Sequence, residues 1–250
     1  MKFSKFFSKK SQSVEEVQQT ASSNSATSES STNTENNCKS ARKKVYNLII
    51  LDESGSMGCI YQSALTGVNE TLQTIRQTED EHPDQEHFVT LVAFDTGHYN
   101  EIYRVTAAAN AVDINENQYR PSGGTPLYDA MGRAINDLDK TAKEGDVVLV
   151  TIITDGYENA SSEYNGDAIK RLVEKMKEKG WVFTYIGANQ DVEKVAMSMS
   201  IDNHLSYDSN EEGTKAMFAK ELRSRKAFFD KVSLSEDCRD LSDNYFHPDE

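Results

Sequence analysis

The chain of 250 residues has few cysteines and no arrangement of them that would stabilise a small secreted domain. Cys38, Cys59 and Cys238 are odd in number and lie far apart. Without a CxxC or Cys/His spacing, they indicate neither a disulfide framework nor a zinc site. We interpret them as reduced thiols, which predicts a cytoplasmic protein.

Long apolar runs are also lacking. The sequence contains no stretch of about 18 apolar residues, the length needed to span a bilayer. Residues 1–10 lack the apolar region of a secretory signal. Phe3, Phe6 and Phe7 are spaced like one face of a helical turn with lysines between them. This segment could therefore touch a membrane surface, although ten residues form a poor helix in water and a frayed tail is the simpler expectation.

Positive charge is scarce outside the N-terminal segment. The chain has 27 Lys and Arg against 41 Asp and Glu, a net charge of −14. Residues 1–44 hold 8 basic and 4 acidic residues, so residues 45–250 hold 19 basic and 37 acidic ones, a net charge of −18. This acidic part of the chain would repel nucleic acid, which argues against a general DNA- or RNA-binding role. It favours either simple solubility or attraction to cations and basic partners.

Composition divides the chain into three parts. Residues 1–43 are rich in Ser, Thr, Asn, Gln and Glu. They are expected to form a disordered tail, because they cannot bury enough apolar surface to offset the entropy of ordering. Residues 44–235 have the density of strands and helices expected of one domain. Residues 236–250 are expected to be a loose acidic C-terminal tail.

Strand and helix patterns alternate within the predicted domain. The expected strands cover 45–51, 87–94, 99–105, 146–154, 181–186 and 204–207, and the expected helices cover 64–77, 125–142, 167–179, 191–199 and 211–232. The alternation predicts an α/β fold with a mostly parallel central sheet and helices on both faces. Residues 99–105 alternate in polarity after a short turn, which predicts an antiparallel edge strand.

One turn of the chain combines three hard oxygen ligands. The apolar run 45–51 ends in the pentapeptide DESGS (residues 52–56), so a buried strand delivers a carboxylate and two hydroxyls into a single turn. Oxygen ligands of this kind suit Mg2+. Thr125 is the expected N-cap of a helix with Pro126 at its first position. Thr125 and Asp155, which ends another strand, can join these ligands, because ligands in such sheets bind at the carboxyl ends of the strands.

The chemistry of these side chains predicts their roles. The hydroxyls of Ser54, Ser56 and Thr125 can bind a cation directly. The carboxylates of Asp52 and Asp155 can bind through water or orient the ion from behind. A site built largely of neutral hydroxyls leaves the cation under-neutralised, so it should attract another anionic oxygen, such as a carboxylate of another protein.

Three segments of the chain together resemble von Willebrand factor type A (vWA) domains with a metal-ion-dependent adhesion site: LDESGSM (51–57), GTPLYDA (124–130) and ITDGYEN (153–159). The resemblance covers about residues 44–200. It implies a Rossmann-like fold and a bound Mg2+ or Mn2+ that ligates a Glu or Asp of a protein partner. The metal-binding positions it implies are Asp52, Ser54, Ser56, Thr125 and Asp155. The N-terminus is similar to that of bacterial or phage-borne intracellular vWA proteins, in which the domain often assembles complexes.

Enzymatic interpretations fit the motifs less well. A Mg2+-dependent phosphatase of the haloacid dehalogenase type would need a second Asp two residues after Asp52, where Ser54 stands. Residues 55–58 do not form the GxSxG turn of hydrolases, and no P-loop motif occurs. We therefore expect no catalytic residues. Two alternatives remain: a Mg2+-dependent phosphatase-like hydrolase, and an acidic scaffold that binds its partner without regard to metal.

Other polar residues near the motifs have simpler explanations. Glu158 and Asn159 could line the rim of the site or lie in a solvated loop. Asp129 is expected to cap or solvate its helix, and Asp95 is expected to belong to a hairpin turn. No two of the five histidines are spaced as a pair, so none is expected to bind metal.

Overall fold

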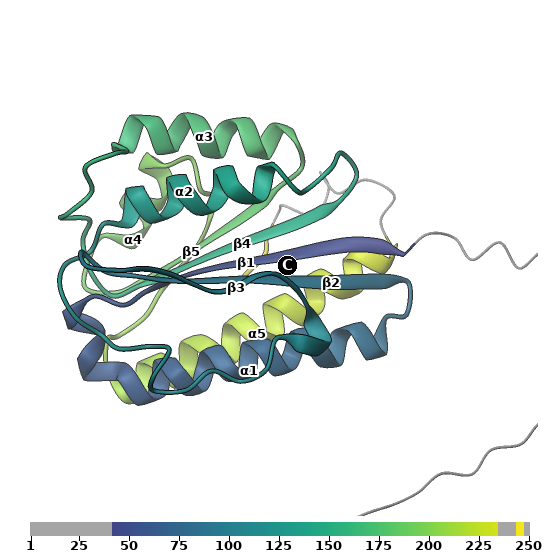
Figure 1. Ribbon diagram of the computed structural model, residues 1–250, viewed down its shortest axis with the longest axis horizontal. Coiled ribbons are helices and arrows are strands. Elements are labelled where there is room, and N and C mark those ends of the chain that lie inside the picture. The colour runs from purple at the N-terminus through teal and green to yellow at the C-terminus, as the bar shows by residue number, and fades with distance from the viewer. Residues whose placement is uncertain (1–41, 235–243, 248–250) are drawn as a thin grey trace, which may run out of the picture. The chain divides into compact units, whose positions relative to one another are not determined.

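The computed structural model describes residues 42–234 and 244–247 (Figure 1). Almost all of the predicted N-terminal tail, including the amphipathic turn of residues 1–10, lies outside the described residues. Most of the predicted acidic C-terminal tail does so too.

A six-stranded sheet forms the centre of the domain, in the order β3-β2-β1-β4-β5-β6. The strands are β1 (Lys43–Asp52), β2 (Gln85–Phe94), β3 (Tyr99–Ala107), β4 (Val147–Thr154), β5 (Val182–Gly187) and β6 (Asn203–Ser206). All neighbouring strands pair in parallel except β3, which runs antiparallel to β2 at one edge. The predicted mostly parallel α/β sheet with an antiparallel edge strand is thus confirmed.

Five α-helices in the described ranges cover both faces of this sheet (Figure 1). They are α1 (Tyr61–Glu81), α2 (Leu127–Asp139), α3 (Gly166–Glu178), α4 (Val192–Ser198) and α5 (Glu211–Leu234), with short 3-10 helices η1 (Gly55–Ile60) and η2 (Ala108–Asn110). Helices α1 and α5 lie on one face, and α2 and α3 lie on the other. Of the helices described, none is both long enough and apolar enough to cross a membrane.

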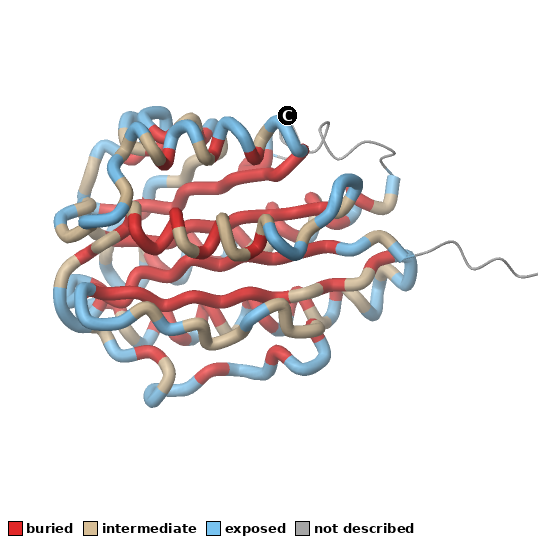
Figure 2. The backbone as a smooth tube through the Cα atoms, turned by 45° about the horizontal axis from the view of Figure 1, so that its top comes forward, coloured by how far each residue is buried: buried red, intermediate tan, exposed pale blue. Residues whose placement is uncertain are grey.

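The core has two apolar layers, one on each face of the sheet. Along β1, Ile49 and Leu51 pack into the layer under α1 and α5, while Leu48 and Ile50 pack into the layer under α2 and α3. Figure 2 shows the central strands buried along most of their length. Burial on both faces explains why these strands read as continuous apolar runs rather than as alternating ones.

Helices α1 and α5 are in close contact. A Cβ atom at residue 67 would lie 2.1 Å from the ring of Phe218. The two helices can therefore approach this closely only because Gly67 has no side chain.

Two expectations from the sequence are corrected by the structure. Thr125 is not the N-cap of α2: Pro126 holds that position and the helix begins at Leu127. Tyr245 and Phe246, within the segment expected to be loose, are buried, and the Tyr245 ring lies 5.8 Å from that of Phe228. These two rings therefore pack into the core, which no periodic pattern in this short acidic segment could indicate.

Candidate metal site

The segments expected to form the site meet at the carboxyl ends of β1 and β4. These strands are neighbours, with Leu51 paired to Ile153. From β1 the chain proceeds to β2 and β3 on one side, and β4, β5 and β6 lie on the other. The strand order therefore reverses at this point, where ligands bind in open α/β sheets. The third segment joins them through the N–H of Gly55, which donates to the carbonyl of Gly123 at 3.1 Å.

Oxygen atoms from two of the segments converge beside Gly156, which lies in the third segment. A Cβ atom at this residue would lie 3.2 Å from Oγ1 of Thr125, 3.4 Å from Oγ of Ser56 and 3.9 Å from Oδ2 of Asp52. The hydroxyl oxygens of Ser54 and Ser56 lie 3.1 Å apart. The structure thus brings all the predicted ligand segments to one small space, which the absence of a side chain at Gly156 leaves open.

Asp52 is buried and held by hydrogen bonds on both carboxylate oxygens. The N–H of Ser54 donates to Oδ1 at 2.7 Å, and the hydroxyl of Thr154 donates to Oδ2 at 2.6 Å. Burial raises the pKa of Asp52 to about 6, against the hydrogen bonds from Thr154 and Ser54, which lower it, and with the help of the nearby charge of Asp155. The carboxylate is therefore rigidly oriented and costly to ionise without a compensating positive charge.

Asp155 is likewise buried, and each of its carboxylate oxygens accepts a hydrogen bond from a hydroxyl group. Ser56 donates to Oδ1 at 2.5 Å and Ser209 donates to Oδ2 at 3.1 Å. The side-chain amide of Asn189 donates to the backbone carbonyl at 3.0 Å. Because Ser56 gives its proton to Asp155, its lone pairs remain available to a ligand.

The hydroxyl of Thr125 makes no hydrogen bond within the described part of the chain. The backbone N–H of the same residue donates to Oδ1 of Asn159 at 2.9 Å, which orients the loop. No group of three or more His, Cys, Asp and Glu side chains that could hold a metal occurs among the described residues. The donor set that fits a hard cation here is therefore made of hydroxyls backed by two carboxylates.

Several residues that support the site were missed or assigned differently from sequence. Thr154 donates to Asp52 and Ser209 donates to Asp155. Thr154 lies within the motif of residues 153–159, whereas Ser209 lies in no motif. Asn159 and Glu158 do not merely line a rim. Glu158 accepts the N–H of Tyr128 at 3.0 Å, so this pair secures the start of α2.

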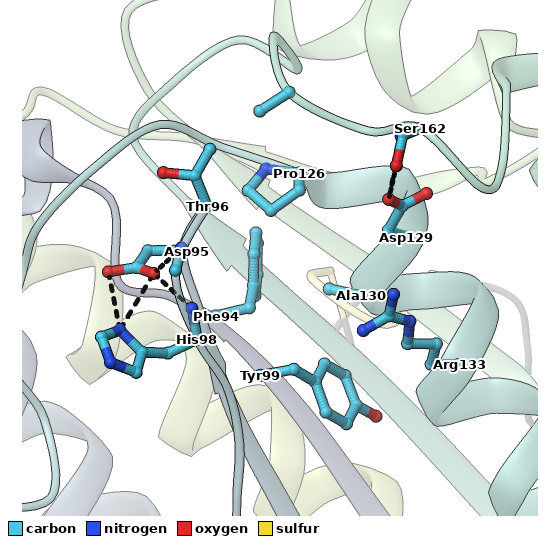
Figure 3. Close-up of a pocket in the computed structure, with 12 residues that line it drawn as sticks. Phe94, Asp95, Thr96, His98, Tyr99, Pro126, Asp129, Ala130, Arg133 and Ser162 are labelled. Atoms are coloured by element: carbon cyan, nitrogen blue, oxygen red, sulfur yellow. Dashed lines mark hydrogen bonds and ion pairs between the residues drawn. The ribbon is translucent and has the colours of Figure 1, made fainter.

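A polar pocket of about 210 Å³ lies beside the site, between the β2–β3 turn and α2 (Figure 3). Asp95 lines it and accepts the N–H groups of Gly97 and His98, which agrees with the predicted hairpin turn. Asp129 also lines it, but instead of capping α2 it accepts backbone N–H groups from residues 162–164. Both carboxylates thus hold loops in place.

A family model described as the von Willebrand factor type A domain matches residues 48–220, more than half of the chain. The chain belongs to this family. The vWA domain accordingly has the Rossmann-like fold of the family, and domains of this type typically mediate protein–protein interaction or adhesion.

Solved structures similar to this vWA domain include pilus proteins. The minor pilin PilB of Streptococcus sanguinis matches with a TM-score of 0.56 and 12% identity over 78% of this chain and 64% of that one. The pilus adhesin SpaC of Lactobacillus rhamnosus GG matches with a TM-score of 0.54 and 15% identity over 75% of this chain and 30% of that one. The vWF domain of the type V pili tip protein Mfa5 of Porphyromonas gingivalis matches with a TM-score of 0.53 and 10% identity over 79% of this chain and 98% of that one.

These likenesses concern the fold. The match spans less than two thirds of the length of PilB and SpaC. A search among curated proteins finds no sequence that matches this vWA domain.

Proposed function

We propose that this vWA domain binds Mg2+ or Mn2+ and uses the ion to bind a Glu or Asp side chain of a protein partner. The residues proposed to hold the ion are Asp52, Ser54, Ser56, Thr125 and Asp155. The observation that carries the proposal is the convergence of oxygens of Asp52, Ser56 and Thr125 beside Gly156, where Ser56 also bonds to Asp155.

The hydrogen bonds of the site support an open coordination position. Both carboxylates have their oxygens engaged by protein donors, so the lone pairs left for direct coordination are mainly those of hydroxyls. Such a ligand set adds little negative charge to a divalent cation. Ser56 is exposed, so a carboxylate could approach from solvent on its side and supply the missing charge.

The proposal assigns no catalytic residue. Structural relatives of the domain are mostly adhesion and pilin domains. A phosphatase-like hydrolase remains the enzymatic alternative, although Ser54 occupies the position where such an enzyme needs its second aspartate. The other alternative is an acidic scaffold that binds its partner without a metal. The proposal also keeps the cytoplasmic location that the cysteines predict.

The first test is metal binding by the full-length protein. Isothermal titration with Mg2+ after EDTA treatment should show one site, and the Ser54→Ala/Ser56→Ala variant should lose at least about tenfold in affinity, because two direct ligands are gone. Ser198→Ala, an exposed serine on α4, is the control and should bind as the wild type does. Equal affinity of wild type and double variant would contradict the proposed site.

The second test is capture of a partner from native cell lysate on the full-length protein. The candidates are proteins that the wild type retains in Mg2+ but not in EDTA, and that the double variant does not retain. Such a protein should lose binding when one of its acidic residues is replaced by the corresponding amide. The same proteins in all three conditions would favour the metal-indifferent scaffold. Turnover of a simple phosphoester that depends on Asp52 would favour the hydrolase.

A further inference from the structure

The turn between β6 and α5 forms a fourth segment of the site, which no motif indicates. Thr154 pairs with Gly187, and Gly187 pairs with Ser206, so these three residues form one row across the sheet. Tyr207 follows Ser206 as Asp155 follows Thr154, and the two therefore leave the sheet at the same level. Two residues later, Ser209 donates its hydroxyl to Oδ2 of Asp155 at 3.1 Å.

Tyr207 carries a buried hydroxyl without a hydrogen-bond partner among the described residues. The residue is 8% exposed, and its ring packs in the layer under α1 and α5. Burial, followed by the charges of Asp155 and Asp52, raises the pKa of this phenol. A buried hydroxyl that forms no bond costs about 1–3 kcal/mol and is rare in folded proteins. Its presence beside the site therefore calls for a partner.

A nearby tyrosine shows the contrasting case. The hydroxyl of Tyr119 is also buried, but it donates to the backbone carbonyl of Asp52 at 3.0 Å. That bond braces the end of β1 whether or not an ion is present. The hydroxyl of Tyr207 has no such role in the fold, which leaves a role toward a ligand of the site.

We propose that Tyr207 is a positioning residue of the metal site, whose hydroxyl bonds to a water molecule of the bound cation beside Asp155. This inference rests on the proposed function. Magnesium keeps several waters when it binds to proteins, and those waters need partners in the surrounding protein. Ser209, in the same turn, complements Tyr207 by donating its hydroxyl to Oδ2 of Asp155. The β6–α5 turn thereby contributes to cation affinity without contributing a direct ligand.

The test is the Tyr207→Phe variant of the full-length protein, which removes only the hydroxyl. In EDTA its stability to urea should equal or exceed that of the wild type, because an unpartnered buried hydroxyl is lost. Its affinity for Mg2+, measured by isothermal titration, should fall by about tenfold or more, as for other outer partners of metal sites. A purely structural role would not separate these two measurements.

The matched control is Tyr99→Phe. The hydroxyl of Tyr99 is also buried and without a partner among the described residues. Tyr99 belongs to β3, however, and lines the polar pocket between the β2–β3 turn and α2, where the Arg133 guanidinium is 5.6 Å from the centre of its ring (Figure 3). Its removal should leave the Mg2+ affinity unchanged.

The outcomes separate the inference from the proposed function. Wild-type affinity in Tyr207→Phe would overturn the role of Tyr207 while the metal site stands. A loss of stability in EDTA as large as the loss of binding free energy would also overturn it, because the hydroxyl would then support the fold. If the wild type does not bind Mg2+, both the role of Tyr207 and the proposed metal site are overturned.

Discussion

The carboxyl group of Asp52 links the site to the stability of the domain. Its pKa is raised to about 6, chiefly by burial, against an ordinary value of 3.8. Without a cation, the folded state therefore holds this proton more tightly than the unfolded chain does. The stability that Asp52 contributes is fully present below about pH 4 and is lost as the pH rises through 6.

We expect the free energy of unfolding in EDTA to fall by about 1.4 kcal/mol more for the wild type than for Asp52→Asn between pH 5 and pH 8. Urea titrations at the two pH values measure this difference. Saturating Mg2+ should abolish the loss, because the ion compensates the charge, and Mg2+ affinity should weaken below pH 6. Parallel pH profiles for wild type and Asp52→Asn in EDTA would contradict the assigned pKa.

Gly156 offers a way to block the site without removing a ligand. In Gly156→Ala the new methyl group would lie 3.2 Å from Oγ1 of Thr125 and 3.4 Å from Oγ of Ser56. Affinity for Mg2+ in isothermal titration should fall by at least about tenfold, while stability in EDTA changes by less than about 1 kcal/mol. Gly58→Ala is the control, because no atom lies within 4 Å of its new methyl group. Unchanged affinity in Gly156→Ala would place the ion elsewhere.

Among single residues, the motifs indicated the candidate ligands better than the residues that support them. Asp52, Ser54, Ser56, Thr125 and Asp155 do come together, because each lies in a short motif at the end of a strand or before a helix. Ser209 could not be predicted, since it reaches Asp155 from a turn with no motif of its own. Its role depends on the packing of β6 beside β5.

At the scale of elements, α5 is attached to the centre of the sheet by a buried charge. Arg225 is 0% exposed and pairs with Glu221 at 2.7 Å. Its guanidinium also donates to Oδ1 of Asn47 on β1 at 2.9 Å and to Oγ1 of Thr151 on β4 at 2.8 Å. The helix is thus bonded to the two strands that end in the site.

Arg225→Met should destabilise the domain by about 3–5 kcal/mol in urea titrations, because Glu221 remains buried without its counter-charge. The double variant Arg225→Met/Glu221→Leu should recover much of this loss. Lys215→Met, which breaks the exposed pair with Glu211 on the same helix, should leave stability nearly unchanged. Equal losses in the single and double variants would show that the ion pair itself does not account for the effect.

Helix periodicity predicted where α5 lies but not what it buries. An arginine on a helix is normally assigned to solvent, but Glu221 together with the polar atoms of β1 and β4 makes the burial of Arg225 tolerable. The start of α2 is a similar case. Thr125 looked like an N-cap by residue type, but its N–H is bound by Asn159, and the helix begins after Pro126.

At the scale of the whole molecule, the net charge of −18 on residues 45–250 should shape association. The proposed metal ion would attract a carboxylate, whereas the acidic domain around it repels acidic proteins at long range. We therefore expect a partner that is basic overall and exposes one acid at the contact.

For such a partner, the association rate should fall as salt is raised, because long-range attraction is screened beyond about 10 Å at 0.1 M ionic strength. The dissociation rate in Mg2+ should change little with salt and rise sharply on addition of EDTA, since the contact through the ion is short-ranged. Surface plasmon resonance with the captured partner measures both rates. Salt-sensitive dissociation that ignores EDTA would instead support the acidic scaffold.

Local sequence was enough to predict the fold class, the order of strands and helices and the five candidate ligands. These depend on apolar periodicity and on short motifs at the ends of strands, which can be read without knowing what packs against them. Packing alone decided which oxygens of the site remain free, that Ser209 and Tyr207 flank it, and that Arg225 and Tyr245 are buried. Hydrogen-bond partners distant in sequence are brought together only when the sheet and its helices assemble.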